Sequence, residues 1–349
     1  MLVSIRAPVG ALNIADRAYG IGRGLCAVRA VDVHPRFLWW LLHARVAELH
    51  AVATGSTYEA VTGEDVGALR IGVTSLAGQR AIADYLDLET SRIDVLIAKK
   101  RRMIELLNER WQSTMAESIS GELLGLPQAS PTGIPWLPTM PADWRRAQLN
   151  LIARLGSGHT PSRQHPEWWE DTTIPWITTG EVSQVRDDRK EYLTETREKI
   201  SEIGLANSAA ELHPADTVVL CRTASAGYSA IMGTNMATSQ DFATWTCGPL
   251  LRPRFLLLCL RVMRQDLLGR LAMGSTHKTI YMPDIESILV PLPSVEVQDS
   301  VVEEAYSRLP AVDASIDLLA RQIVLLVEHR QALITAAVTG EIDIAGAAA

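Results

Sequence analysis

The 349-residue sequence has little lysine, phenylalanine and cysteine, and it contains no long apolar run. Apolar runs such as FLWWLL at 37–42 and FLLLCL at 255–260 are far shorter than the roughly 20 residues that a helix needs to cross a bilayer. The N-terminus carries no basic segment followed by an apolar stretch and a small-residue cleavage site. We therefore expect a cytoplasmic protein without membrane contact.

Motifs that would indicate catalysis or metal binding are also missing. The four cysteines lie far apart without a CxxC pair, which favours reduced thiols over a zinc site or a disulfide framework. None of the five lysines follows a glycine, which excludes a P-loop ATPase, and the HExxH zinc pattern is absent. The Asn/Asp-Pro-Pro-aromatic loop of a DNA aminomethyltransferase is absent too. We predict no catalytic residue, no metal and no cofactor in this chain, and we do not expect an enzyme.

The net charge of −7 argues against nucleic-acid binding at first sight. The acidity is concentrated at the C-terminal end, however. Residues 1–278 hold 30 Lys and Arg against 29 Asp and Glu, whereas residues 279–349 hold 3 against 11. Most of the chain is close to neutral, so its charge leaves DNA binding open.

An internal duplication organises the sequence. Residues 55–122 align with residues 274–341 at a constant offset of 219, without a gap, and 16 of the 68 positions are identical. The matches include a Gly-Ser-Thr triplet, Gln79 with Gln298, and a closing Gly-Glu pair. A repeat of this length indicates two copies of a domain-sized unit rather than a solenoid.

Each copy ends in a segment with the 4-3-4-3 apolar spacing of a coiled coil. Helices over about 39 residues would each be about 58 Å long, and two helices with matching seams should pair in antiparallel fashion. An ordinary helical bundle that packs the same stripes is the alternative, and Pro310 could kink the second helix or mark the first turn of a new one. The predicted seam residues are Ile93, Ile97, Ile104 and Leu107 in the first copy, and Val312, Ile316, Leu319, Ile323 and Leu326 in the second.

Short β-like runs broken by glycine and proline precede each helix, for example IPWITTGEV, DTVVLCR, YSAIMG and ILVPLP in the second copy. We predict an α+β chain with two α/β globules, the first one truncated, separated by two long helices that pair as an antiparallel coiled coil. The expected division is a first globule at 1–78, a helix at 79–122, a linker at 123–133, a second globule at 134–297, a helix at 298–341 and a tail at 342–349.

The two globules differ at their front. Met1 aligns with about Asp216, so residues 134–215 of the second copy have no counterpart in the first. Three explanations of this difference are open: a truncated gene, a misplaced start or a true half-unit.

The chain resembles the DNA-specificity (S) subunit of type I restriction-modification systems. The matching segments are LGSGHTPSR at 155–163, the following IPWITTGEV, PLPSVEVQ before the second helix, LAGQRAIADYLDLETSRIDVLIAKKRRMIELL in the first helix, and the closing AVTGEIDI. The resemblance implies that each globule is a target-recognition domain for one half of a bipartite double-stranded DNA site, and that the helices hold the two domains apart. It also implies a non-catalytic subunit that directs adenine methylation and restriction.

The resemblance further implies partner proteins. Modification subunits would bind the helices and carry S-adenosylmethionine, and restriction subunits would join through the complex and use ATP and Mg²⁺. The first globule lacks the LGSGHTPSR-like segment, so a second copy of the chain is a further expected partner that could complete it. The alternative function is a degenerate scaffold that binds modification subunits without recognising specific DNA.

Candidate DNA contacts come from polar loops. Arginine can bind guanine through two hydrogen bonds, while Ser and Thr often hold phosphates. The alternative is that these residues only build turns. The candidates are Thr160, Ser162 and Arg163 in a Gly/Pro-rich loop, Arg222, Thr223 and Ser225 after DTVVLC, Ser275, Thr276, His277 and Lys278 in a polar turn, and Arg6 in the related place of the first globule.

Overall fold

The computed structural model describes residues 1–55, 59–129, 131–272 and 278–344. The chain divides into two compact units. Unit 1 consists of residues 1–106 with 314–349, and unit 2 consists of residues 107–313. The boundary passes through both long helical segments, so each unit contains a globule and part of the helix pair.

The long helices follow the predicted coiled-coil segments. The first is α3 (Leu76–Ile119), and the second segment consists of α8 (Val295–Ser307) and α9 (Leu309–Thr339), separated at Arg308. Ser294 begins α8 by accepting a hydrogen bond from the amide of Val297. Pro310 lies at the start of α9, where a missing N–H removes no helical hydrogen bond.

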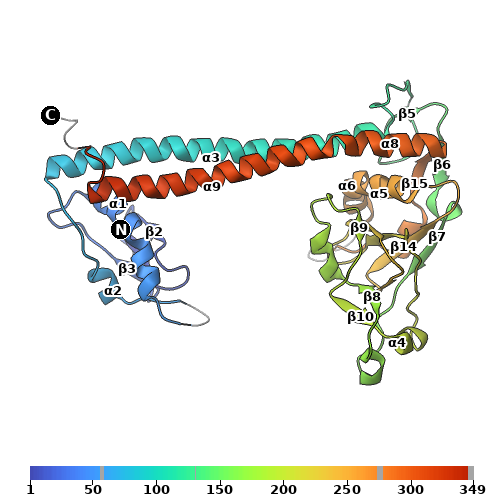
Figure 1. The fold of residues 1–349 in the computed structure, drawn as a ribbon, viewed down its shortest axis with the longest axis horizontal. Coiled ribbons are helices and arrows are strands. Elements are labelled where there is room, and N and C mark those ends of the chain that lie inside the picture. Colours follow the sequence, from blue (N-terminus) through green and yellow to red (C-terminus); the bar gives the residue numbers. More distant parts are fainter. Residues whose placement is uncertain (56–58, 130, 273–277, 345–349) are drawn as a thin grey trace. The chain divides into compact units, whose positions relative to one another are not determined.

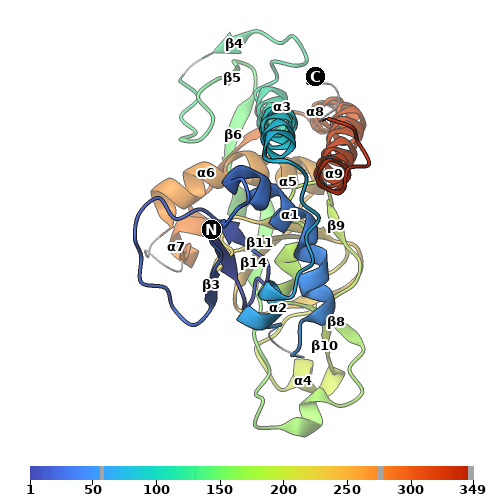
Figure 2. The same cartoon turned by 90° about the vertical axis from the view of Figure 1, so that its left-hand side faces the viewer.

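The helices run antiparallel and lie side by side (Figures 1 and 2). In unit 1, Lys100 Nζ donates to Gln322 Oε1 at 2.6 Å. Asp94, which precedes it on α3, accepts from Arg330 Nε at 2.9 Å, and Arg330 follows Gln322 on α9. The order of contacts is therefore reversed between the two helices, and the predicted antiparallel arrangement is confirmed.

The predicted seam residues are buried or half-buried. Ile93, Ile97 and Leu319 are buried, each less than 10% exposed. The other members are half-buried: Ile104, Leu107, Val312, Ile316, Ile323 and Leu326. Leu96, which lies next to Ile97 but off the seam, is 46% exposed, so the seam is the face that the helices share.

Unit 2 is built on a five-stranded sheet with the order β7-β14-β11-β12-β9. All neighbouring strands in it are antiparallel except β9 and β12. Helix α5 (Pro253–Val262) packs between this sheet and α8 (Figure 1), and its residues 255–261 are all buried. The strands are β7 (Ala153–Ser157), β9 (Tyr192–Leu193), β11 (Val218–Cys221), β12 (Ser229–Met232) and β14 (Phe242–Cys247).

Smaller elements complete unit 2. A second sheet has the order β10-β8-β13, and two further pairs are β15-β6 and β4-β5. These strands are β4 (Gln128–Ala129), β5 (Met140–Pro141), β6 (Arg145–Gln148), β8 (Ile174–Ile177), β10 (Glu198–Ile200), β13 (Ala237–Thr238) and β15 (Leu289–Leu292). The short helices are η1 (Leu149–Leu151), η2 (Pro166–Trp169), η3 (Thr179–Gln184), α4 (Glu202–Ala206), α6 (Arg264–Asp266), η4 (Leu267–Leu271) and α7 (Met282–Glu286).

Unit 1 has a smaller globule with the same central plan. Its sheet has the order β2-β1-β3, formed by β1 (Leu2–Ser4), β2 (Leu12–Asn13) and β3 (Leu25–Ala27). Helix α1 (Pro35–Val52) follows this sheet as α5 follows the sheet of unit 2, and α2 (Gly63–Gly67) precedes α3. The predicted duplication of the sequence is thus visible as a repeated sheet–helix–long helix order.

One glutamine makes the same contacts in both units. Gln79 accepts from the amide of His34 and donates to the carbonyl of Thr74. Gln298, 219 residues later, accepts from the amide of Arg252 and donates to the carbonyl of Pro293. The connection into the long helix is therefore built alike in both copies.

Candidate nucleic-acid interface

Three loops of unit 2 meet at one end of the five-stranded sheet. Strand β7 ends at Ser157 and β11 ends at Cys221, while β14 begins at Phe242. The register places Ser157 opposite Ala243, and Cys221 opposite Phe242. We use the name loop cluster for residues 158–163, 222–228 and 239–241, together with residues 278–280, which join them.

Gln240 connects two of the predicted DNA contacts. Thr160 Oγ1 donates to Gln240 Oε1 at 2.7 Å, and Arg222 Nε donates to the carbonyl of Gln240 at 2.9 Å. The loop after β7 can approach this closely because residue 158 is glycine. A Cβ there would lie 1.9 Å from the carbonyl oxygen of Thr238. Thr160 and Arg222, 62 positions apart in the sequence, therefore belong to one surface.

Asp241 anchors the loop that follows β11. Its carboxylate accepts from Thr223 Oγ1 and from Ser239 Oγ, the latter at 3.1 Å. Its backbone carbonyl accepts from the amide of Arg222 at 2.8 Å. Ser225 lies half-buried in the same loop. The hydroxyl group of Thr223 thus helps to hold the loop in shape.

The sequence prediction missed Gln240 and Asp241. The usable signal was the polar triplet SQD at 239–241, which ends just before a strand of buried residues. Only the pairing of β14 with β7 and β11 shows that this triplet lies beside the loops that were selected.

Arg163 lies at the side of the small sheet. Its guanidinium carbon is 3.5 Å from the ring centroid of Trp169, and its Nη2 forms an ion pair with Glu198 at 2.7 Å. The carbonyl of Ser162 accepts from Trp169 Nε1 at 3.2 Å. The side chain of Arg163 is 59% exposed, so an anion can still approach it.

The remaining candidates are placed differently. Lys278 is exposed, and its Nζ donates to the carbonyl of Leu268. The amide of Ile280 donates to the carbonyl of Arg222 at 2.8 Å, and this hydrogen bond brings residues 278–280 into the loop cluster. Arg6 is exposed at the end of β1 in unit 1. Ser275, Thr276 and His277 lie outside the described residues.

The loop cluster is basic although the whole chain is acidic. It contains Arg163, Arg222 and Lys278 against the acid Asp241, and Glu198 outside the cluster pairs with Arg163, which leaves a difference of one positive charge. The Asp241 carboxylate is occupied by two hydroxyl groups. Cationic side chains around a rim of hydroxyl and amide groups suit a polyanion.

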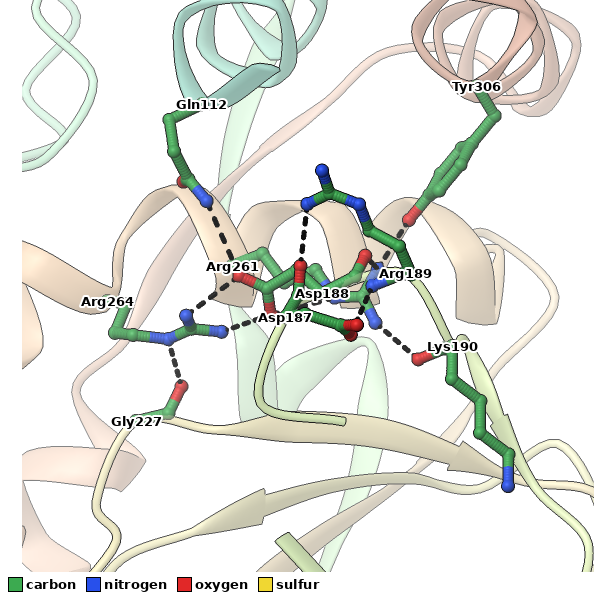
Figure 3. A network of polar contacts seen from close by, with 9 residues as sticks. All are labelled: Gln112, Asp187, Asp188, Arg189, Lys190, Gly227, Arg261, Arg264 and Tyr306. Atoms are coloured by element: carbon green, nitrogen blue, oxygen red, sulfur yellow. Dashed lines mark hydrogen bonds and ion pairs between the residues drawn. The ribbon is translucent and has the colours of Figure 1, made fainter. Parts of the chain in front are cut away.

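A buried ion-pair network supports this end of the sheet (Figure 3). Asp188 is about 1% exposed and accepts from Arg264 Nη1 at 2.8 Å. Arg264 Nε also donates to the carbonyl of Gly227 at 2.9 Å. Gly227 has a φ of +89°, and a Cβ there would lie 2.8 Å from Arg264 Cγ. Arg264 therefore fixes the end of the loop that carries Arg222.

Arg261 links the same network to the helices. It is buried and donates to the backbone carbonyls of Asp188 and Lys190 and to the hydroxyl of Tyr306 on α8. Burial raises the pKa of Tyr306 to about 12, although the charge of Arg261 opposes this shift. Tyr306 therefore stays neutral and acts as a hydrogen-bond acceptor for Arg261 at physiological pH.

The cysteine nearest the loop cluster is chemically quiet. Cys221 is the last residue of β11, and burial raises the pKa of its thiol to about 11. A thiol with such a pKa is protonated at neutral pH and is a poor nucleophile.

In the part of the chain that the structure describes, no helix is long and apolar enough to span a membrane.

Comparisons with known proteins identify relatives. A family model described as the type I restriction modification DNA specificity domain matches residues 141–328. Two curated proteins of Methanocaldococcus jannaschii are similar. The putative type I restriction enzyme MjaX specificity subunit is 30% identical over 125 residues, which are 35% of this chain and 28% of that protein. The type I restriction enzyme MjaIX specificity subunit is 22% identical over 200 residues, which are 57% of this chain and 41% of that protein. The match thus spans less than half the length of either relative.

Solved structures share the fold. A chain from a study of complex assembly and conformational transition of the type I R-M system aligns with a TM-score of 0.65 at 20% identity, over 92% of this chain and 75% of that one. The HsdS subunit of Thermoanaerobacter tengcongensis aligns with a TM-score of 0.52 at 19% identity, over 91% of this chain and 74% of that one. The family model covers more than half of the residues, and the chain belongs to the type I restriction modification DNA specificity family.

Proposed function

We propose that this protein recognises double-stranded DNA through the loop cluster of unit 2 and directs modification subunits to a bipartite site, where they methylate adenine. The observation that carries the proposal is the joining of Thr160, Arg222 and Gln240 at one basic end of the sheet. This surface lies within the residues that the family model matches. Restriction at the same site would follow from restriction subunits that join the complex.

The side chains of the loop cluster suit base recognition. Arg222 uses only its Nε for side-chain bonding among the described residues, which leaves both Nη groups for a bidentate contact with guanine. Gln240 is exposed and can offer its amide group to adenine. Lys278 and Arg163 are exposed cations that suit phosphate contacts. We expect Arg222 to contribute to sequence selection and the other two mainly to affinity.

The helix pair offers a surface for modification subunits. Large apolar side chains off the seam are 46–63% exposed in unit 1, and such surfaces typically mark protein contacts. They are Leu88, Val95, Leu96, Met103 and Leu106 on α3, and Leu318, Val324, Leu325 and Val327 on α9. In this proposal S-adenosylmethionine belongs to the modification subunits, and ATP with Mg²⁺ belongs to the restriction subunits.

Methylation mapping tests the proposed function. The chain is co-expressed with its cognate modification subunit, and methylated adenines are mapped across the genome by single-molecule sequencing. We expect a bipartite motif. R222A should abolish methylation or relax one base of the motif, because a bidentate contact contributes about 1–3 kcal/mol of discrimination. R154A is the matched control, since Arg154 is an exposed arginine on β7 paired with Glu211.

The outcomes separate the alternatives. A motif with two unrelated halves would mean that a second recognition domain is present in the complex. A palindromic motif would mean that two copies of this chain each contribute unit 2. A stable complex without methylation would contradict the proposal and favour a scaffold that binds modification subunits only.

A further inference from the structure

The duplication creates two equivalent strand positions, and only one of them is paired within the part of the chain that the structure describes. In unit 2, β15 at 289–292 pairs with β6 at 145–148. The offset of 219 places residues 70–73 of unit 1 at the position of β15. Within the described residues, these four residues form no strand and make no backbone hydrogen bond. Among the described residues, unit 1 therefore has no strand paired at this position.

The exposure of equivalent side chains shows the same difference. Val290 in β15 is fully buried. Its counterpart Ile71 is 38% exposed, and the next residue but one, Val73, is 58% exposed. Both are apolar residues with high strand propensity, which suits a sheet position better than a surface loop.

The glycines that follow the two long helical segments differ in how closely they are packed. Gly121 and Gly340 are equivalent and have similar φ values, +77° and +82°. A Cβ on Gly121 would meet Pro141 at 3.0 Å and Trp144 at 3.2 Å. A Cβ on Gly340 would meet nothing within 4 Å among the described residues. The space that the Trp144 segment fills in unit 2 is not filled by any described residue of unit 1.

This open space is a groove of about 450 Å³ within unit 1. Its lining includes Gly72, Val73 and Thr74 on one side and Val338, Gly340 and Ile344 on the other. The equivalent hydrogen bonds of Gln79 and Gln298 show that the chain around it has the same local structure as in unit 2. The groove is therefore preformed.

We propose that residues 69–73 accept an antiparallel β-strand with the chemistry of residues 143–149 of this chain. In unit 2 that segment supplies Trp144 over the helix-end glycine and Leu149, which is fully buried after β6. The donor strand therefore carries a tryptophan and, five residues later, a leucine or similar residue. Main-chain hydrogen bonds provide affinity in such strand addition, and the side-chain pockets provide specificity.

The register of unit 2 predicts which residues of the acceptor form hydrogen bonds. Leu149 donates its amide to the carbonyl of Ile288, so positions 288, 290 and 292 are the hydrogen-bonding ones. Pro291 lies between them and has no N–H. In unit 1, Ile71 and Val73 should therefore bond to the donor strand, whereas Gly72 should not.

A peptide with the sequence of residues 139–151, labelled with fluorescein and added to the full chain, tests the proposal by fluorescence anisotropy. We expect saturable binding. I71P should weaken it at least tenfold, because proline removes a hydrogen-bonding N–H from the acceptor. G72P is the matched control and should bind normally, because proline already occupies the equivalent position 291. A peptide with W144A should bind more weakly than the unchanged peptide.

Circular dichroism melting curves check that the variants fold, and V73P provides a second, independent block of the same strand edge. Absence of peptide binding to the unchanged chain would overturn the proposal. Equal binding to the unchanged chain, I71P and V73P would overturn it as well, because the peptide would then have replaced β6 in unit 2 or bound elsewhere.

Discussion

Asp188 and Arg264 form a bidentate, nearly buried ion pair, in which both carboxylate oxygens of Asp188 accept from the guanidinium group. Asp188 has a φ of +60°, a left-handed conformation that Asp and Asn adopt more readily than other side chains. The same carboxylate lies 3.5 Å from Arg261 Nε. One buried anion thus balances two arginines beneath the loop cluster.

D188N should destabilise unit 2 by about 3 kcal/mol, because removal of one partner leaves buried charge uncompensated. Asparagine keeps the size and tolerates the positive φ, so the loss would report charge rather than shape. The measurement is urea unfolding followed by circular dichroism. D187N changes the neighbouring exposed aspartate and should alter the free energy of unfolding by less than about 0.5 kcal/mol. Equal effects of the two variants would contradict the assigned role.

I97A should destabilise the helix pair by about 2–3 kcal/mol, because it removes buried apolar volume from the seam. L96A, the adjacent substitution at a side chain that is 46% exposed, should cost far less in the isolated chain. Thermal melts of both variants check this prediction. If a modification subunit binds the exposed apolar face as proposed, L96A should instead weaken the complex in pull-down titrations, whereas I97A should not do so at temperatures where it is folded.

G158A should disrupt DNA recognition, because the added Cβ would collide with the carbonyl of Thr238 and displace the loop that carries Thr160. We expect at least a tenfold loss of DNA affinity for the assembled complex, measured by gel-shift titration at fixed salt. G180A is the control, since a Cβ on Gly180 has its nearest neighbour at 3.5 Å. A variant G158A that binds DNA normally would show that this loop does not take part in recognition.

The stability of unit 1 should fall as the pH is lowered from about 6.5 towards 4. Burial, followed by the charges of Arg330 and Arg36, lowers the pKa of His43 to about 4 in the folded chain. His43 therefore takes up a proton at a higher pH in the unfolded chain than in the folded chain. The contribution of neutral His43 to the free energy of unfolding is complete above about pH 6.5 and is lost as the pH falls towards 4. Because His43 is partly exposed, we expect a loss of about 1 kcal/mol.

The pH prediction is checked by comparing urea midpoints between pH 7 and pH 4.5 for the unchanged chain and for H43Q. The variant should lose part of the pH dependence. H329Q, at an exposed position on α9, serves as the control and should keep all of it. Parallel pH profiles for the unchanged chain and H43Q would rule out this role of His43.

The regular parts of the fold could be predicted from the sequence because they depend on local spacing. The seam at Ile93, Ile97 and Leu319 follows from heptad periodicity, since a helix places residues three and four apart on one face. The break at Arg308 was harder to locate, because Pro310 is compatible either with a kink or with the first turn of a new helix.

The candidate site was only partly predictable because its residues meet through strand pairing. Nothing near Thr160 in the sequence points to Gln240, and the two join only because β7 and β14 are neighbours in the sheet. Arg163 was grouped with Thr160 by sequence proximity, yet its side chain lies on Trp169 and pairs with Glu198. A turn of a few residues is enough to direct neighbouring side chains to different sheets.

The polar pairs on the helix seam have a consequence for sliding along the helix axis. Apolar seam residues repeat every heptad, so a shift of one helix by seven residues would recover much of their packing. Lys100 with Gln322 and Arg330 with Asp94 do not repeat in this way, and such a shift would separate both pairs at once. These two contacts therefore select one axial alignment from several that the apolar seam alone would tolerate.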